Sequence, residues 1–214
     1  MIFNNREHAG ELLARRLIRY KGKNPLVLGI PRGAVPMAKI IADTLGGELD
    51  VVLVRKLGYP GQPELALGAI DESGKPFLAD YAGEVEVAYL EAEKKKQAEV
   101  IRRRRELYTP ARPPLEPHNR IVIVVDDGIA TGATMVTALR AIRAKKPKKL
   151  IAAVAVASSQ AARSIARECD TLVCLDVPAE FRAVGQFFRD FSQVYDEDVV
   201  EILRQSEARI STPA

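Results

Sequence analysis

Apolar residues along the chain form short runs rich in valine, isoleucine and leucine that alternate with helical patterns. Between Arg6 and Tyr20 they recur at helical spacing among charged residues, which predicts an amphipathic opening helix. Uninterrupted apolar runs of four to nine residues are typical of strands buried on both faces of a sheet. Predominantly apolar runs of this kind cover residues 26–30, 49–54, 121–125, 150–157 and 171–177, with Asp50 and Asp176 as interruptions. We therefore expect these runs to form parallel strands.

Helical patterns separate several of these predicted strands. They cover residues 35–45, 132–145 and 160–168, and the first of them ends at the glycine pair Gly46 and Gly47. Strands that alternate with helices indicate an α/β protein with a mostly parallel central sheet flanked by helices. The length of 214 residues fits a single domain over residues 1–214.

The segment from residue 57 to residue 118 departs from this alternation. Gly58, Pro60, Gly61 and Pro63 predict a loop at its start. Residues 65–70 and 76–78 are compatible with a hairpin, and residues 84–108 form a highly charged helical pattern that stops before a proline cluster. We interpret residues 57–118 as a mobile loop plus a helical insertion, which together form an excursion from the core.

Composition restricts the class of protein. The chain is 47% hydrophobic with a net charge of +4, so a soluble globular protein is expected and binding to nucleic acid is not required. The two cysteines, Cys169 and Cys174, have no His or third Cys nearby in the sequence, which favours free thiols in a reducing compartment. The N-terminal residues carry charges throughout and contain no apolar run long enough to predict a signal peptide or a membrane span. These features predict a cytoplasmic protein with no membrane association.

The candidate chemistry lies in the stretch IVIVVDDGIATGATM, which runs from Ile121 to Met135. An apolar strand delivers Asp126 and Asp127 to a loop of small residues that leads into a helix. Small residues and the helix N-terminus suit a phosphate, while adjacent carboxylates suit a vicinal diol, so a sugar phosphate meets both demands. The stretch fits neither a P-loop nor a dinucleotide glycine pattern. The alternative is an ordinary strand-to-helix turn with an aspartate cap.

This stretch resembles the phosphoribosyl pyrophosphate motif of type I phosphoribosyltransferases, a family that includes the hypoxanthine and adenine enzymes. The resemblance implies that Asp126 and Asp127 hold the ribose hydroxyls, steady the charge that develops on the sugar and face a Mg²⁺ ion. It also implies a loop for the 5′-phosphate. That loop comprises Gly128, Ile129, Ala130, Thr131, Gly132, Ala133 and Thr134.

Two further segments resemble the diphosphate-binding parts of the family. Arg32 and Gly33 follow the first predicted strand and match the pyrophosphate loop. Arg55 and Lys56 end the next strand and are similar to the basic pair that opens the mobile catalytic loop of the family. Basic side chains converging from two loops, together with Mg²⁺, would stabilise the departing diphosphate.

The segment from residue 178 to residue 195 is similar to the C-terminal hood of hypoxanthine-guanine phosphoribosyltransferases. The resemblance places Phe181 over the base, where a ring can stack on a purine, and Arg189 at the pyrophosphate. We expect Phe187, Phe188 and Phe191 to serve in packing.

The identity of the acceptor stays open, with a purine favoured. Ala130 stands where the 6-oxopurine enzymes carry an acid, and residues 157–163 contain no lysine where those enzymes place one. Adenine enzymes share the alanine and take their acid from the mobile loop. Glu64 is the local candidate for that acid, and the alternative is a solvated loop carboxylate.

Two basic runs, Lys94–Lys96 and Arg102–Arg105, mark the inserted helix. Interleaved glutamates favour a solvated helix face, and the alternatives are a nucleic-acid surface or a cover for the active site. The sequence thus favours a phosphoribosyltransferase that forms a homodimer, as the family resemblance implies. The rival functions are a nucleic-acid-binding regulator that senses phosphoribosyl pyrophosphate, and phosphoribosyl transfer to a non-purine acceptor.

Overall fold

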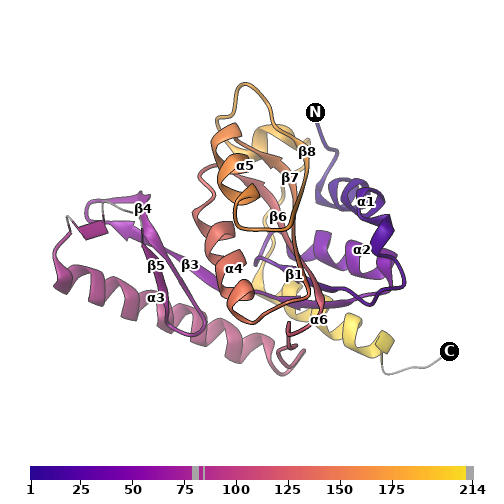
Figure 1. Ribbon diagram of the computed structural model, residues 1–214, viewed down its shortest axis with the longest axis horizontal. Helices are drawn as coiled ribbons and strands as arrows, with labels where there is room; N and C mark the ends of the chain where they lie inside the picture. The colour runs from indigo at the N-terminus through magenta and orange to yellow at the C-terminus, as the bar shows by residue number, and fades with distance from the viewer. Residues whose placement is uncertain (79–81, 84, 211–214) are drawn as a thin grey trace.

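A five-stranded parallel sheet forms the core of the protein (Figure 1). The computed structural model describes residues 1–78, 82, 83 and 85–210, without the side chains of residues 63–66 and 208–210. The strand order is β2-β1-β6-β7-β8, and every neighbouring pair is parallel. The strands are β1 (Leu26–Gly29), β2 (Glu48–Val51), β6 (Ile121–Ile129), β7 (Lys149–Ala157) and β8 (Thr171–Asp176). The predicted fold class is confirmed.

Helices cover both faces of this sheet. Figure 1 shows α1 and α2 on one side and α4 and α5 on the other. Their bounds are α1 (Arg6–Arg16), η1 (Ile18–Tyr20), α2 (Val35–Leu45), α4 (Ala133–Ala144) and α5 (Ser159–Ala166). In the described part of the chain, no helix combines the length and the hydropathy needed to cross a membrane.

The strands bury both of their faces in separate cores. Along β6, Ile123 and Val125 join the core on the side of α1 and α2, whereas Val122 and Val124 join the core on the side of α4 and α5. Successive side chains of a strand point to opposite faces, so an uninterrupted apolar run can fill two cores at once. This is why the runs in the sequence identified the strands.

The sheet has its topological switch point between β1 and β6. From β1 the chain passes through α2 to β2, whereas from β6 it passes through α4 to β7 on the other side. The backbone N–H of Ile30 donates to the carbonyl of Val125 over 3.0 Å, which keeps the two strand ends together. Ligands of open α/β sheets bind outside the carboxyl ends of the strands at such a point.

A second unit, which we call the arm (residues 54–108), projects from the core (Figure 1). It contains an antiparallel sheet of β3 (Val54–Tyr59), β4 (Gln62–Asp71) and β5 (Pro76–Leu78), with α3 (Val87–Tyr108) packed against it. The predicted hairpin of residues 65–70 with 76–78 is confirmed. The predicted loop after residue 57 is wrong, because β3 and β4 pair as a hairpin and leave only a tight turn at Pro60 and Gly61.

The arm leaves the core after β2 and returns to the same strand. After α3, the backbone N–H of Leu115 donates to the carboxylate of Asp50 over 2.8 Å. Arg112 forms an ion pair with Glu48 at 3.1 Å. Both acids belong to β2, so the entry and the exit of the arm lie side by side.

The C-terminal part of the chain packs over the N-terminus. The short helix η3 (Val184–Phe187) precedes a bridge between Phe3 and Phe188. The final helix, α6 (Asp196–Ile210), was not among the predicted elements. It contacts α2, β2 and α3 and buries Val199 and Leu203 in the core.

Candidate active site

The two acids occupy the end of strand β6. The expectation that they lie in a loop is wrong, because β6 continues to Ile129 and carries both of them. The backbone N–H of Asp127 donates to the Asp126 carboxylate over 2.9 Å. The strand ends at the switch point, so the acids stand where a ligand of this fold is expected.

Arg6, at the start of α1, neutralises one of the acids. Its Nε donates to Asp127 Oδ2 over 2.8 Å, and the two side chains are only 12% and 14% exposed. Its guanidinium also donates to the carbonyl of Ser192 and lies 3.8 Å from the centre of the Phe191 ring. Arg6 thus links the acid pair, the first helix and the C-terminal segment.

The electrostatic environment disfavours two full negative charges on the pair. Burial raises the pKa of Asp126 well above the usual aspartate range, and the charge of Asp127 raises it further. Burial also raises the pKa of Asp127, against the opposing effect of Arg6. A ligand that brings hydrogen-bond donors or a cation would therefore bind favourably to these two carboxylates.

The loop after β1 packs directly on the acids. A Cβ atom on Gly33 would lie 2.2 Å from Asp127 Oδ2, so any larger residue at this position would displace the carboxylate. The peptide bond between Pro31 and Arg32 is cis. The predicted pyrophosphate loop and the predicted ribose acids are therefore immediate neighbours.

A pocket of about 420 Å³ opens in front of these residues, and we call it the arginine pocket. It contains four arginines, contributed by α1, the β1–α2 loop, β3 and α3. Its lining consists of Arg6, Pro31, Arg32, Gly33, Arg55, Arg104, Asp127, Phe191, Gln193 and Val194. This excess of cations suits a polyanionic ligand.

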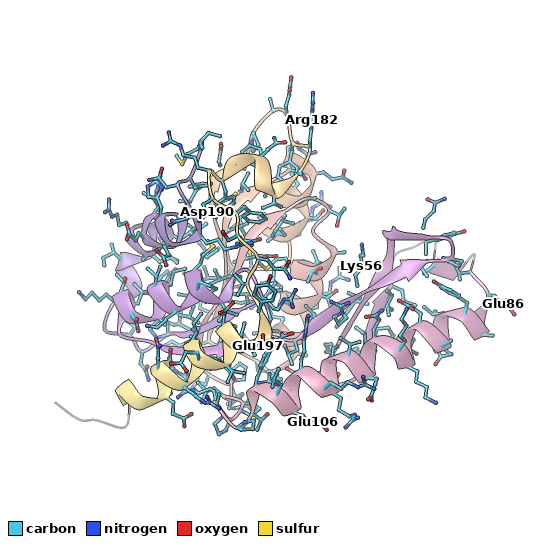
Figure 2. The ribbon with its side chains drawn as sticks, turned by 180° about the vertical axis from the view of Figure 1, so that it is seen from behind. Lys56, Glu86, Glu106, Arg182, Asp190 and Glu197 are labelled. Carbon is cyan, nitrogen blue, oxygen red and sulfur yellow. The ribbon has the colours of Figure 1, made fainter. Side chains whose placement is uncertain are left out.

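The basic pair Arg55 and Lys56 is divided by the pleat of β3. Arg55 lines the arginine pocket and donates through Nε to Gln97 of α3 over 3.1 Å, whereas Lys56 does not line it. Adjacent residues of a strand face opposite sides, so only Arg55 of the pair lines the pocket in this structure, and the role of Lys56 stays a prediction. Figure 2 shows Lys56 at the base of the arm and Glu86 near its far end.

The predicted phosphate loop joins β6 to α4. Gly128 and Ile129 belong to the strand, and the loop itself is confined to residues 130–132. Gly132 caps α4 in a left-handed conformation, with no side chain bonded to the first turn. The amide groups of a helix N-terminus without a side-chain cap can bind an anion.

The predicted hood residues have different environments. Phe187 and Phe188 are buried, as expected for packing, and Phe181 is half-buried against Phe187 with ring centres 5.4 Å apart. Phe191 packs as expected, with its ring stacked on Phe188 at 4.9 Å between centres, and it also lines the arginine pocket in contact with Arg6. Arg189 has an exposed side chain and does not line that pocket.

The packing of the hood explains why residue 128 is a glycine, and the sequence alone did not reveal this. A Cβ atom at this position would lie 2.3 Å from Cγ1 of Val184 in η3. The glycine thus allows the hood to sit close to β6.

Few side chains of the site are candidates for binding Mg²⁺ or for transferring a proton. Within the described ranges, no three His, Cys, Asp or Glu side chains form a group that could hold a metal ion. Mg²⁺ is usually held by one or two carboxylates together with substrate phosphates, so the pair Asp126 and Asp127 fits that role. The side chain of Glu64, the predicted loop acid, lies outside the described residues.

The two cysteines are free and half-buried. Burial raises the pKa of Cys174 to about 11 and raises the pKa of Cys169 as well. Since the thiolate is the reactive form, neither thiol is suited to nucleophilic chemistry at neutral pH.

Residues that sequence reasoning missed complete the pocket. Arg6 lies in a helix 121 positions from Asp127, and no local motif marks it. Arg104 does have a signal, since it shares a helical face with the buried Gln97, Ile101 and Tyr108. That periodicity could have separated it from the other arginines of its run.

The fold and the site together define a phosphoribosyl transferase domain. The family described as phosphoribosyl transferase domain matches residues 1–186, and the chain belongs to this family. This match confirms the resemblance drawn from the sequence.

Particular relatives agree with this assignment. The protein TT1426 of Thermus thermophilus has a crystal structure with a TM-score of 0.84 and 46% identity, over 96% of this chain and 99% of that one. A Mycobacterium tuberculosis protein provisionally named phosphoribosyl transferase is 42% identical over 94% of this chain. The chain spans only 46% of the length of that relative. A hypothetical protein of Neisseria gonorrhoeae shares the fold at 12% identity, with a TM-score of 0.50 over 98% of this chain and 95% of that one.

Proposed function

We propose that the protein transfers the 5-phosphoribosyl group from phosphoribosyl pyrophosphate to a nitrogenous acceptor and releases pyrophosphate. The observation that carries this proposal is the packing of the Arg32–Gly33 loop against Asp127 at the mouth of a pocket rich in arginine. This reaction breaks the bond between the ribose and the diphosphate. An acid suited to the ribose hydroxyls and a loop suited to the diphosphate lie in contact here, so they can bind the two groups that this bond joins.

The acids and the phosphate loop would hold the sugar. In this proposal Asp126 and Asp127 accept hydrogen bonds from the ribose hydroxyls and steady the positive charge that develops on the ring. The raised pKa values of the pair support such a role, because donors and positive charge offset the repulsion between the acids. The amides of residues 130–134, with Thr131 and Thr134 adding hydroxyls, would bind the 5′-phosphate.

The cations would hold the leaving group. Arg32 and Arg55 line the pocket, and we retain Lys56 and Arg189 as predicted ligands that would have to reorient toward it. Mg²⁺ held by the acids and the diphosphate would neutralise part of the leaving charge. The chain itself orients the sugar between the acids and the arginines.

For the acceptor we propose a purine base stacked on Phe181. The half-buried ring beside η3 offers a flat apolar face, which supports the proposal. Glu64 is retained as the candidate proton-transfer group. The basic run gives little support to the rival regulator, because Arg102 and Arg103 are paired with Glu99. We also propose a cytoplasmic homodimer, which light scattering and cell fractionation would test.

The test is pyrophosphate release from phosphoribosyl pyrophosphate with Mg²⁺, across purine, pyrimidine and simple amine acceptors. Release with a purine supports the full proposal, and release only with another acceptor supports the transferase but rejects the purine. Calorimetry with phosphoribosyl pyrophosphate alone runs in parallel. Binding without release from any acceptor would favour the sensor, and absence of binding would reject the site.

The matched control is the double variant Asp126→Asn, Asp127→Asn. We expect it to lose turnover while keeping its circular dichroism spectrum, since both asparagines keep the size of the acids. Unchanged turnover would overturn the assignment of the acids. Addition of EDTA should abolish release by the wild type if Mg²⁺ takes part.

A further inference from the structure

One face of α3 reaches the arginine pocket. Gln97, Ile101, Arg104 and Tyr108 follow one another at helical spacing, and all but Arg104 are buried. Figure 2 shows α3 running from Glu86 at the far end of the arm toward the core, with Glu106 near the core. The arm therefore presents Arg104 to the pocket from a fixed helix.

Arg104 differs from its neighbours in the basic run. Its side chain is 21% exposed and lines the pocket, whereas the side chain of Arg103 is 74% exposed and paired with Glu99 at 2.9 Å. Arg105 turns toward the arm sheet and pairs with Glu72 at 2.7 Å. Only one arginine of the run thus has the geometry to meet a ligand in the pocket.

Arg104 shares its counter-ion with Arg32, and this carboxylate lies relatively far from both guanidinium groups. Asp196, the first residue of α6, lies 3.7 Å from Arg104 and 3.5 Å from Arg32, and it also accepts a hydrogen bond from the Tyr108 hydroxyl. One carboxylate therefore serves two guanidinium groups at distances too long for strong charge-assisted bonds.

Arg55 adds a third cation to the same region. Burial lowers its pKa, and the charges of Arg104 and Arg32 lower it further, against the opposing effect of Glu93. Arg32, Arg55 and Arg104 all line the arginine pocket, so the three guanidinium groups can act on one anion. A diphosphate carries several negative charges and accepts paired hydrogen bonds from guanidinium groups.

We propose that Arg104 is a diphosphate-binding residue supplied by the arm, and that Asp196 is the internal counter-ion that the diphosphate displaces from Arg104 and Arg32. This inference rests on the proposed function. It gives the arm a direct part in ligand binding. It also means that Asp196, in the first turn of α6, competes with the ligand for the two arginines.

The first experiment is calorimetric titration of the full chain with inorganic pyrophosphate and Mg²⁺. Arg104→Gln should weaken binding at least tenfold, and Arg104→Lys should recover part of the loss because it restores the charge but not the fork of donors. Arg103→Gln is the matched control on the same helix and should stay within twofold of the wild type. Equal affinity of Arg104→Gln and the wild type would overturn the proposal.

The second experiment tests the competition. Asp196→Asn should tighten pyrophosphate binding severalfold, since it removes the charge that the ligand has to displace but keeps an acceptor for Tyr108. Glu197→Gln, on the exposed neighbour labelled in Figure 2, is the control and should leave the affinity unchanged. Weaker or unchanged binding by Asp196→Asn would overturn the competitor role.

The outcomes separate this inference from the function on which it rests. A wild type that binds neither pyrophosphate nor phosphoribosyl pyrophosphate would overturn both. A wild type that binds both ligands, with Arg104→Gln binding them equally well, would overturn only the role of Arg104.

Discussion

Removal of Arg6 tests how the acid pair is tolerated inside the protein. The change Arg6→Gln takes away the only cation bonded to Asp127 among the described contacts, at 2.8 Å, and also the contact with the Phe191 ring at 3.8 Å. We expect lower stability, a pH-dependent deficit and at least a tenfold loss of turnover, since Arg6 orients Asp127 at the pocket.

The expected loss of stability follows from the ion pair of Arg6 with Asp127 and its contact with the Phe191 ring. A hydrogen bond between charged, largely buried groups contributes about 2–3 kcal/mol. The stacking of a guanidinium on an aromatic ring adds about 0.5–1 kcal/mol. A total of about 3 kcal/mol, at ~2–4 °C per kcal/mol for a protein of this size, lowers Tm by roughly 6–12 °C.

The pH dependence has a definite sign. Burial raises the pKa values of Asp126 and Asp127, so the folded state binds more protons than the unfolded state and stability falls as pH rises through the raised values. Arg6 opposes this rise, and without it the fall becomes deeper and extends to higher pH. The deficit of Arg6→Gln should therefore be larger at pH 8 than at pH 5.

Differential scanning calorimetry across this pH range checks the prediction. Arg15→Gln, on an exposed position of α1, is the matched control and should change stability by less than about 0.5 kcal/mol. Adding Asp126→Asn to Arg6→Gln should recover part of the loss at pH 8. An equal deficit at both pH values, with no recovery, would show that Arg6 acts by packing alone.

Three further predictions follow from single contacts. Gly128→Ala should cost about 1–3 kcal/mol by pressing on Val184, and adding Val184→Ala should restore Tm in thermal melts unless the clash is relieved elsewhere. Gln97→Leu should raise KM for phosphoribosyl pyrophosphate several-fold with little change in kcat, because Arg55 loses its fixed acceptor; steady-state kinetics with unchanged KM would reject this positioning role. Burial raises the pKa of Cys174 to about 11, so this half-buried thiol should react with a thiol reagent at pH 8 much more slowly in the native protein than after unfolding, and equal rates in the two states would contradict the prediction.

The core could be predicted because its strands fill two cores and therefore leave predominantly apolar runs in the sequence. The run ending at Val125 located β6, and the acids after it located the switch point. The end of β6 was misplaced because Asp126 and Asp127 are poor strand formers by composition, whereas pairing with β7 holds them in the sheet.

The arm was harder to predict, because its strands pair only with one another. Glycines and prolines between Gly58 and Pro63 indicated a loop, yet the hairpin accommodates them at a turn and a bulge. Arg6 and Asp196 reach the pocket through tertiary packing between segments far apart in the sequence. No spacing rule connects such residues, so only the structure could bring them together.

The attachment of the arm to a single strand has a consequence for variation among relatives. Because the chain departs after β2 and comes back to Asp50 and Glu48, residues can be gained or lost at the tip near Glu86 without shifting the register of the central sheet. The base of the arm should tolerate no change in length, because it carries Arg55 near the start of the arm and Arg104 near its end. Natural changes in length should therefore accumulate at the tip, while the spacing between these two arginines and the core stays fixed.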